Sequence, residues 1–225
     1  MILSLETSTP TCSVALHQEG QLIASTDLHV EKSHSEKLTL VIQKLLVHAG
    51  ITPAELTAVA VSAGPGSYTG LRIGTSSAKG LCFSLDIPLI AIDTLTAMAA
   101  GVQKYLPSDI LCPMIDARRM EVYCQLVSEN LAVVQETEAK IIDSSSFEDI
   151  LSSRKIVFFG NGAHKCKEAI QSENATFIDE VHPSAVHIGA LASLAYDQGK
   201  FEDVAYFEPH YLKEFQAIKP KKLIS

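Results

Sequence analysis

The residues with the clearest chemical potential lie in the segment GPGSYTGLRIG, from Gly64 to Gly74. Its four glycines follow an apolar run at 57–63 that is typical of a buried strand, and they lead into a helical pattern at 70–84. A glycine-rich turn between a strand and a helix often cradles phosphate, because amide groups at a helix N-terminus attract anions. The spacing, however, matches neither G-x-x-x-x-G-K-[ST] nor G-x-G-x-x-G. The glycines therefore predict an unusual turn and a helix that another backbone approaches closely.

Other residue types with catalytic potential form no recognisable site. The hydroxyl residues at 67–69 lie in G-P-G-S-Y-T-G, which is not the G-x-S-x-G turn of a serine hydrolase, and no histidine and acid can be assigned to complete a triad. None of the eight histidines is followed by another at i+4. His29 and His34 are five residues apart, as are His182 and His187, so histidines near helix starts are a simpler interpretation than metal ligands.

The composition is that of a globular protein that would need a partner to hold nucleic acid. The chain has 225 residues, 47% hydrophobic and 20% charged, enough for one large or two small domains. Its net charge of −8 works against direct nucleic-acid binding, and only the tail from Lys219 to Lys222 is basic. Because no long apolar run and no leader are visible, we expect a cytoplasmic protein with no membrane partner. The five scattered cysteines are expected to be buried thiols.

Hydrophobic periodicity predicts two successive units with the same order of elements. In the first, three strands within residues 1–28 precede a helix at 33–49, with Ser33 and Glu36 as its capping box. A strand at 57–63, a helix at 70–84, a strand at 88–92 and a helix at 94–104 follow. In the second, strands at 111–117, 120–128 and 131–139 precede a helix at 146–153 capped by Ser145, a strand at 155–159, a helix at 163–172, a strand at 176–178 and a helix at 184–197.

This repeated order predicts an α/β protein with a duplicated ribonuclease-H-like fold in two lobes. The N-terminal lobe would span residues 1–105, and a shorter, divergent C-terminal lobe would span 106–225. The arrangement resembles the architecture shared by actin, sugar kinases and Hsp70 (the ASKHA fold). Proteins of that architecture hold nucleotide phosphates between two β-hairpins, one from each lobe.

The resemblance to that architecture implies a nucleotide site in the cleft. Glu6 would end the first hairpin strand, with Thr7 and Ser8 in the turn, and Asp116 would end the equivalent strand of the second hairpin. Glu6 and Asp116 either hold Mg²⁺ through waters or cap strand ends and bind nothing. The adenosine position falls on the turn GNGA, at Gly160 and Gly162. No longer glycine-rich run is present there, so we expect at most weak, vestigial ATP or ADP binding and no required cofactor.

Several motifs in the same segments resemble one family more closely. The segments LSLETSTPTCSVAL, HSEKL, GPGSYTGLRIG and IDARRMEVY are similar in order and spacing to the TsaB (YeaZ) family. The resemblance covers nearly all of residues 1–130, and more weakly GNGA and EPHYLK. It implies a role in making threonylcarbamoyladenosine beside the tRNA anticodon. In that pathway the paralogue TsaD transfers the threonylcarbamoyl group, and the ATPase TsaE is a third component.

The resemblance also implies that this chain carries no catalytic site. TsaD-like proteins bind a metal through two histidines four residues apart on a helix, and by alignment those positions fall on Thr94 and Met98. Neither side chain replaces an imidazole in holding a catalytic iron or zinc, and a thioether is a soft, weak ligand. We therefore expect no metal site and no enzyme activity. The alternatives are an ATP-dependent small-molecule kinase of the same architecture and a metallopeptidase.

The helices at 33–49 and 70–84 are the predicted partner-binding elements. Glycine costs about 1 kcal/mol relative to alanine inside a soluble helix, so the glycine face at 70–84 needs a compensating close contact. We expect a four-helix contact with TsaD, replaced by a homodimer when the chain is alone, a docking surface for TsaE, and only indirect contact with tRNA. The three arginines Arg72, Arg118 and Arg119 either grip phosphate or an acidic partner or form surface salt bridges. The residues predicted to form the interface are Leu38, Val41, Leu45, Gly70, Arg72, Gly74, Ser77 and Ala78.

Overall fold

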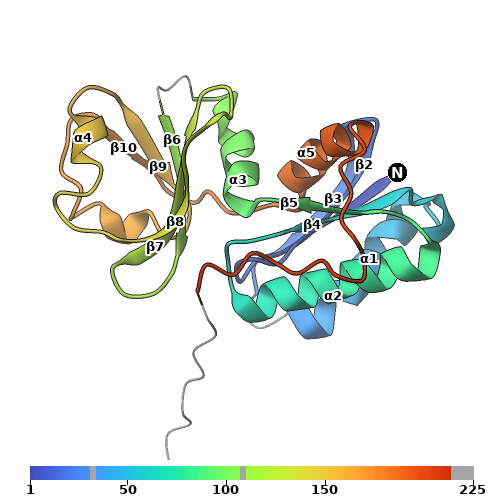
Figure 1. The fold of residues 1–225 in the computed structure, drawn as a ribbon. Coiled ribbons are helices and arrows are strands. Elements are labelled where there is room, and N and C mark those ends of the chain that lie inside the picture. Colours follow the sequence, from blue (N-terminus) through green and yellow to red (C-terminus); the bar gives the residue numbers. More distant parts are fainter. Residues whose placement is uncertain (31–33, 107–109, 214–225) are drawn as a thin grey trace, which may run out of the picture.

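The computed structural model describes residues 1–30, 34–106 and 110–213, which form two lobes side by side (Figure 1). The N-terminal lobe is built on a five-stranded sheet in the order β3-β2-β1-β4-β5. Its strands are β1 (Ile2–Glu6), β2 (Cys12–Gln18), β3 (Gln21–Leu28), β4 (Ala58–Ser62) and β5 (Leu89–Ile92). The strands β1, β2 and β3 are antiparallel, whereas β4 and β5 run parallel to β1.

The C-terminal lobe repeats this sheet strand for strand. Its order is β10-β9-β6-β7-β8. The strands β6, β7 and β8 are antiparallel, whereas β9 and β10 run parallel to β6. Its strands are β6 (Ile110–Asp116), β7 (Glu121–Ser128), β8 (Val133–Ile141), β9 (Ile156–Phe159) and β10 (Ala175–Ile178). Glu6 and Asp116 therefore end equivalent strands, β1 and β6. The prediction of a duplicated two-lobed α/β fold is confirmed.

The helices that cover the N-terminal sheet are not all neighbours in the sequence. Helices α1 (His34–Ala49) and α2 (Tyr68–Leu85) pack on one face, and α5 (Ala185–Asp197) packs on the other (Figure 1). Successive β1 residues divide between them, since Leu3 joins the α1–α2 core and Ile2 joins a core with Ile188 of α5. Helix α3 (Thr94–Gln103) packs instead against β6 and β7.

The predicted lobe boundary at 105/106 therefore needs correction. It separates the two sheets properly, but α5 lies at 185–197 in the sequence and completes the N-terminal lobe. The C-terminal segment also returns to that lobe, where Glu202 bridges Leu89. Conversely, α3 supplies Leu95 and Met98 to the core of the C-terminal lobe. Periodicity shows that these helices bury an apolar face, but it does not say which sheet covers that face.

The second half is less helical than the sequence predicts. The expected helix at 146–153 shortens to α4 (Glu148–Leu151), and its N-cap is Phe147 rather than Ser145. The expected helix at 163–172 is reduced to the 3₁₀ turn η2 (His164–Cys166). In the first half a second 3₁₀ turn, η1 (Pro53–Glu55), precedes β4. The capping box assigned to Ser33 lies outside the described residues, as does the basic tail.

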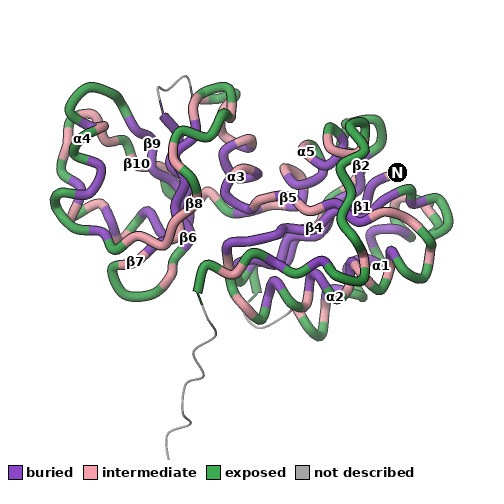
Figure 2. The backbone as a smooth tube through the Cα atoms, in the orientation of Figure 1, coloured by how far each residue is buried: buried purple, intermediate pink, exposed green. Residues whose placement is uncertain are grey.

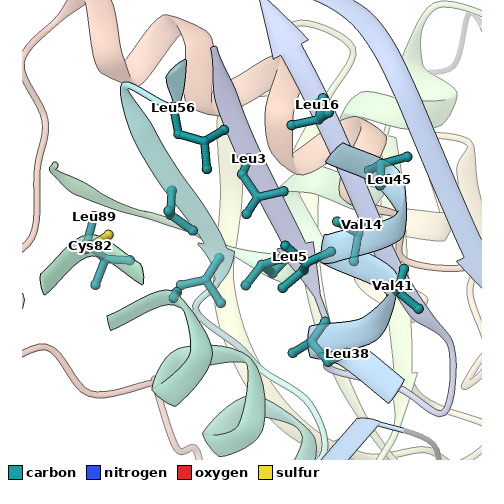
Figure 3. Close-up of a cluster of buried hydrophobic side chains, with 14 of the residues drawn as sticks. Leu3, Leu5, Val14, Leu16, Leu38, Val41, Leu45, Leu56, Cys82 and Leu89 are labelled. Carbon is teal, nitrogen blue, oxygen red and sulfur yellow. The ribbon is translucent and has the colours of Figure 1, made fainter. Parts of the chain in front are cut away.

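Buried residues follow the strands of both sheets and the inner sides of the helices (Figure 2). The N-terminal core joins Leu3 and Leu5 of β1 and Val14 of β2 to the inner face of α1 (Figure 3). All five cysteines are buried thiols, as predicted. Burial raises the pKa of Cys12 and Cys82 to about 11, so neither is a reactive thiolate at neutral pH. Among the described helices, none is long and apolar enough to cross a membrane.

Candidate functional site

A cavity of about 460 Å³ lies between the lobes, and we call it the interlobe pocket. The N-terminal lobe contributes the β1–β2 turn at 8–10 and the glycine loop with the start of α2 at 65–69. The C-terminal lobe contributes the end of β6 and its turn at 115–118, together with Tyr123 and Asn161. The C-terminal segment at 210–213 forms the remaining wall. Both predicted hairpins thus meet at one pocket.

The glycines fix the geometry of the N-terminal wall. A Cβ at Gly66 would lie 2.6 Å from the Ser8 carbonyl oxygen, and a Cβ at Gly70 would overlap the Thr7 carbonyl oxygen. The backbones are hydrogen-bonded at this approach, since the Ser67 amide donates to Ser8 O at 2.6 Å. The prediction of a close backbone approach is therefore confirmed, but its neighbour is the β1–β2 turn and not a partner helix.

Glu6 lies behind this wall and does not line the pocket. Its carboxyl is fully buried, and Oε1 accepts from the Ser8 amide at 2.5 Å and from Ser62 Oγ at 3.2 Å. Burial raises the pKa of Glu6 from 4.5 to about 7, against the opposing effect of these hydrogen bonds. Such a carboxyl is not available to water-bound Mg²⁺ in the pocket. The expectation of a magnesium ligand at Glu6 is not supported by the donor set.

Replacing Glu6 with Gln should stabilise the protein increasingly as the pH rises. The folded pKa lies above the unfolded value, so Glu6 contributes full stability below about pH 4.5 and loses it as the pH rises through about 7. The amide is neutral throughout and keeps an acceptor for Ser8. Urea unfolding should therefore show the variant gaining about 3 kcal/mol on the wild type between pH 4 and pH 8. The exposed Glu136→Gln is the charge-removal control, and an equal gain there would refute the assignment.

At the second hairpin a lysine takes the place expected for a metal. Lys165 Nζ forms an ion pair with Asp116 Oδ1 and donates to Arg119 O at 2.6 Å and Glu121 O at 2.7 Å. These three bonds use all three protons of the ammonium group. The Arg118 amide donates to the same Asp116 oxygen at 3.0 Å. Asp116 is thereby neutralised within the chain, so the residues here do not fit a divalent metal either.

The turn GNGA is packed against β6 rather than open to a base. A Cβ at Gly160 would overlap the Met114 carbonyl oxygen, and one at Gly162 would lie 2.9 Å from the Ile115 carbonyl carbon. The side chain between them faces the pocket, and Asn161 Oδ1 accepts from the Asp116 amide at 3.0 Å. These glycines are thus explained by strand packing, and the assignment of this turn to adenosine is not supported.

The C-terminal segment closes the pocket and was missed as a site element. His210 N donates to Ala63 O at 2.7 Å, and the Tyr211 ring lies 4.8 Å from the Tyr68 ring. Lys213 forms an ion pair with Glu121 in the other lobe. The only signal in the sequence is the run EPHYLK, whose polar and aromatic residues have no periodicity. Arg72 lies 4.3 Å over the Tyr68 ring, and among the described residues neither Arg72, Arg118 nor Arg119 forms an ion pair.

Most residues predicted to form the partner interface lie inside the protein. Leu38 is 1% exposed, and it packs with Val41 and Leu45 in the core of the N-terminal lobe (Figure 3). On α2, Gly70, Gly74 and Ala78 are buried, and a Cβ at Gly74 would overlap Thr7 Oγ1. Of the predicted set, only Arg72 is exposed and Ser77 half-buried. The choice of helices stays a prediction, but the apolar stripe was the wrong face, because it packs on the chain's own sheet.

The opposite faces of the same helices are exposed (Figure 2). We call the exposed residues Leu40, Val47, Ser76, Gly80 and Phe83 the α1–α2 outer face. Val47 is 69% exposed and Phe83 is 85% exposed, although both are large and apolar. Gly80 is in the middle of α2 with open space around it, since a Cβ there would meet nothing within 4 Å. No contact within the described chain explains this glycine.

Similarity to known proteins shows the family to which the chain belongs. A family model described as TsaD, tRNA N6-adenosine threonylcarbamoyltransferase, matches residues 28–221. The tRNA threonylcarbamoyladenosine biosynthesis protein TsaB of Bacillus subtilis is 31% identical over 221 residues, covering 96% of this chain and 95% of the relative. The chain belongs to the TsaB (YeaZ) family. The relationship to the transferase model agrees with TsaB and TsaD being homologous.

Solved structures place the TsaB-family chain among known folds. YeaZ from Pseudomonas aeruginosa matches with a TM-score of 0.82 at 26% identity, covering 94% of this chain and 99% of that one. The activator of 2-hydroxyisocaproyl-CoA dehydratase from Clostridium difficile, solved with bound ADPNP, matches with a TM-score of 0.52 at 12% identity, covering 88% of this chain and 95% of that one. At this identity the second match speaks for the fold alone, which is of the actin-like class.

The two positions at which the resemblance implied histidines in TsaD-like proteins, Thr94 and Met98, lie in the interior of this TsaB-family chain. Thr94 is the first residue of α3 and Met98 lies one turn later, and both are at most 1% exposed. Met98 packs with Leu111 and Phe159 against the C-terminal sheet. Within the described ranges no group of three or more His, Cys, Asp and Glu side chains is placed to hold a metal ion. The positions contribute to packing between the lobes.

Proposed function

We propose that this chain is a non-catalytic scaffold subunit of the complex that makes threonylcarbamoyladenosine in tRNA. The observation that carries the proposal is family membership combined with the chemistry at 94 and 98, where a buried hydroxyl and a buried thioether replace the two imidazoles implied for TsaD. The transfer reaction therefore belongs to TsaD, and this chain supports it by binding.

The α1–α2 outer face is the surface on which TsaD would dock. It contains two large apolar side chains, Val47 and Phe83, that are mostly exposed. It also contains Gly80, which lowers helix stability by about 1 kcal/mol relative to alanine, a cost that a closely packed neighbour would offset. Apolar anchors beside small residues suit helix-on-helix packing, because small residues let helix axes approach each other. Without TsaD the same face would pair with a second copy around a two-fold axis. TsaE would dock on the assembled pair, and tRNA would contact the complex mainly through TsaD.

The geometry does not favour the alternative functions. A small-molecule kinase of this fold needs hairpin carboxylates free for Mg²⁺, whereas Glu6 is enclosed and Asp116 is paired with Lys165. A metallopeptidase needs ligands on α3, where Thr94 and Met98 are enclosed by packing.

Threonylcarbamoyl incorporation into tRNA tests the proposed function. Purified TsaD, TsaE and threonylcarbamoyl-adenylate should give little product without this chain and at least tenfold more with it, whereas this chain alone should give none. Product formed by this chain alone would contradict the non-catalytic role. Equal product from TsaD and TsaE without it would contradict the scaffold role, and a kinase assay on sugars and other small alcohols would then come next.

A further inference from the structure

We propose that helix α5 is an acid-sensitive joint between the lobes, and that α5 is released more easily when His17 and His187 take up protons. The proposal does not depend on the scaffold role, because α5 lies on the face of the N-terminal sheet opposite to α1 and α2. Two helix glycines, Gly101 and Gly189, make room for the two histidine rings.

The lobes meet through helices α3 and α5, which lie between the two sheets (Figure 1). Helix α5 packs on the N-terminal sheet, α3 packs on β6 and β7, and the two helices pack on each other. Ala97 of α3 shares a buried cluster with Ile188 and Ala192 of α5. Release of α5 would therefore loosen the lobes from each other as well as uncover one face of the N-terminal sheet.

On both sides of α5 a histidine ring fills the space left by a glycine. His17 of β2 is 1% exposed, and a Cβ at Gly189 of α5 would overlap its Nδ1. His187 of α5 is half-buried, and a Cβ at Gly101 of α3 would overlap its Nε2. One ring thus lies where α5 meets the sheet, and the other lies where α5 meets α3. Both contacts are broken when α5 moves away.

The surroundings of His17 favour the neutral ring. The ring is hydrogen-bonded to the backbone of Val186, and Nδ1 has no hydrogen-bond partner among the described residues. The neighbours of His17 on the flanking strands are Ile2 of β1 and Leu22 of β3, whose side chains are apolar. The titratable group that acts on it from α5 is His187, which repels a charge on His17 when both are protonated. A protonated His17 is therefore poorly accommodated while α5 is packed.

His187 lies near one cation and one anion. Burial is the largest influence on the pKa of His187 and lowers it, Lys104 of α3 lowers it further, and Asp27 of β3 raises it. Asp27 is exposed, so water weakens its attraction for a proton on the ring. The groups around the second ring thus also favour its neutral form.

Acid should favour release of α5, because the released state binds more protons. While α5 is packed, burial lowers the pKa of both histidines below the usual value of 6.5, which they regain on release. Their contribution to packing is therefore complete above about pH 6.5 and is lost as the pH falls below that value. Between pH 7.5 and pH 5.5 the equilibrium constant for release should rise about tenfold for each histidine and about 100-fold for the pair.

Hydrogen exchange of the full chain, read by mass spectrometry of peptides from α5, tests the proposal. The parent protein is Glu6→Gln, because Glu6 titrates in the same pH range with the opposite sign. After correction for the intrinsic exchange rate, the protection of α5 should fall about 100-fold between pH 7.5 and pH 5.5. The protection of α1, on the other face of the sheet, should change by less than about threefold.

Glutamine variants assign the response to the two rings. His17→Gln and His187→Gln keep an N–H donor and take up no proton in this range, so each should reduce the response to about tenfold and the double variant should abolish it. The ratio between the two pH values is taken within each variant, so that a uniform loss of packing cancels. His182→Gln is the matched control, because it removes an exposed histidine just before α5 and should keep the full response.

Three results would overturn the proposal. They are a full response in the double variant, an equal reduction in His182→Gln, and protection of α5 in the parent that either does not fall or falls together with that of α1, which would be global unfolding. Circular dichroism at pH 7.5 checks the folding of each variant, and His187→Gln, at the half-buried position, decides alone if His17→Gln does not fold. The scaffold role is read from the tRNA incorporation assay, so the two proposals fail independently.

Discussion

Replacing Gly70 with Ala is expected to destabilise the protein by about 3 kcal/mol, a large part of the stability of an ordinary domain. The added methyl group would overlap the Thr7 carbonyl oxygen, which belongs to the backbone directly after β1. Relief requires α2 to move away from the β1–β2 turn, and that movement breaks the bond from Thr7 Oγ1 to Gly70 O at 2.8 Å. The cost is an overpacking cost combined with a lost buried hydrogen bond.

Thermal and urea unfolding of purified Gly70→Ala measure this effect. About 3 kcal/mol corresponds to a fall of roughly 6–12 °C in Tm for a chain of this size. The matched control is Gly80→Ala in the same helix, which has open space around it and should gain about 1 kcal/mol from helix propensity. Equal stabilities of the two variants would contradict the close approach described for the glycine loop.

The sequence predicts the fold well where the pattern is local. Alternation within β1 and β2, and the apolar stripe of α1, are enough to give three antiparallel strands followed by a helix, and their recurrence after residue 110 reveals the duplication. The lobe boundary could not be predicted in the same way. Helix α5 is separated from β1 by most of the chain, and its apolar residues, such as Ile188 and Ala192, fit either sheet by composition.

The candidate site was only partly predictable, because the charge and accessibility of its carboxylates depend on contacts with residues that are distant in the sequence. Glu6 and Asp116 were identified at equivalent strand ends, and the structure places them there. Their availability could not be predicted: Lys165 is 49 residues away from Asp116, in a segment that reads as a helix and is a 3₁₀ turn. The wall at 210–213 has no pattern that indicates a site.

The interface prediction shows how one motif serves two purposes. A glycine in a helix indicates that something approaches closely, and the sequence does not say whether the neighbour is internal or external. At Gly70 and Gly74 the space that a Cβ would occupy is taken by atoms of Thr7 in the same chain. Gly80 is exposed, and a Cβ there would have no atom of the described chain within 4 Å, so we expect its close neighbour to be another molecule. Burial, rather than spacing, separates the two kinds of glycine.

Replacing Gly80 with Trp is therefore expected to leave the chain folded and to weaken TsaD binding at least 100-fold. The indole has open space around it in the isolated chain, so Tm should stay within about 3 °C of the wild type. Against a helix packed on the α1–α2 outer face the indole would displace the partner, and a loss of about 2.7 kcal/mol in binding free energy is a 100-fold change in Kd.

Mixing experiments with purified TsaD measure the affinity. The control is Leu194→Trp, at an exposed position of α5 on the other side of the sheet. Unchanged affinity in Gly80→Trp would move the interface elsewhere, whereas loss in both variants would point to a general effect of added surface indole. Loss of TsaD binding in Gly80→Trp alone would mean that the glycines of α2 have two different roles. Those on the buried face allow α2 to pack on the β1–β2 turn, and Gly80 on the exposed face allows the partner to approach.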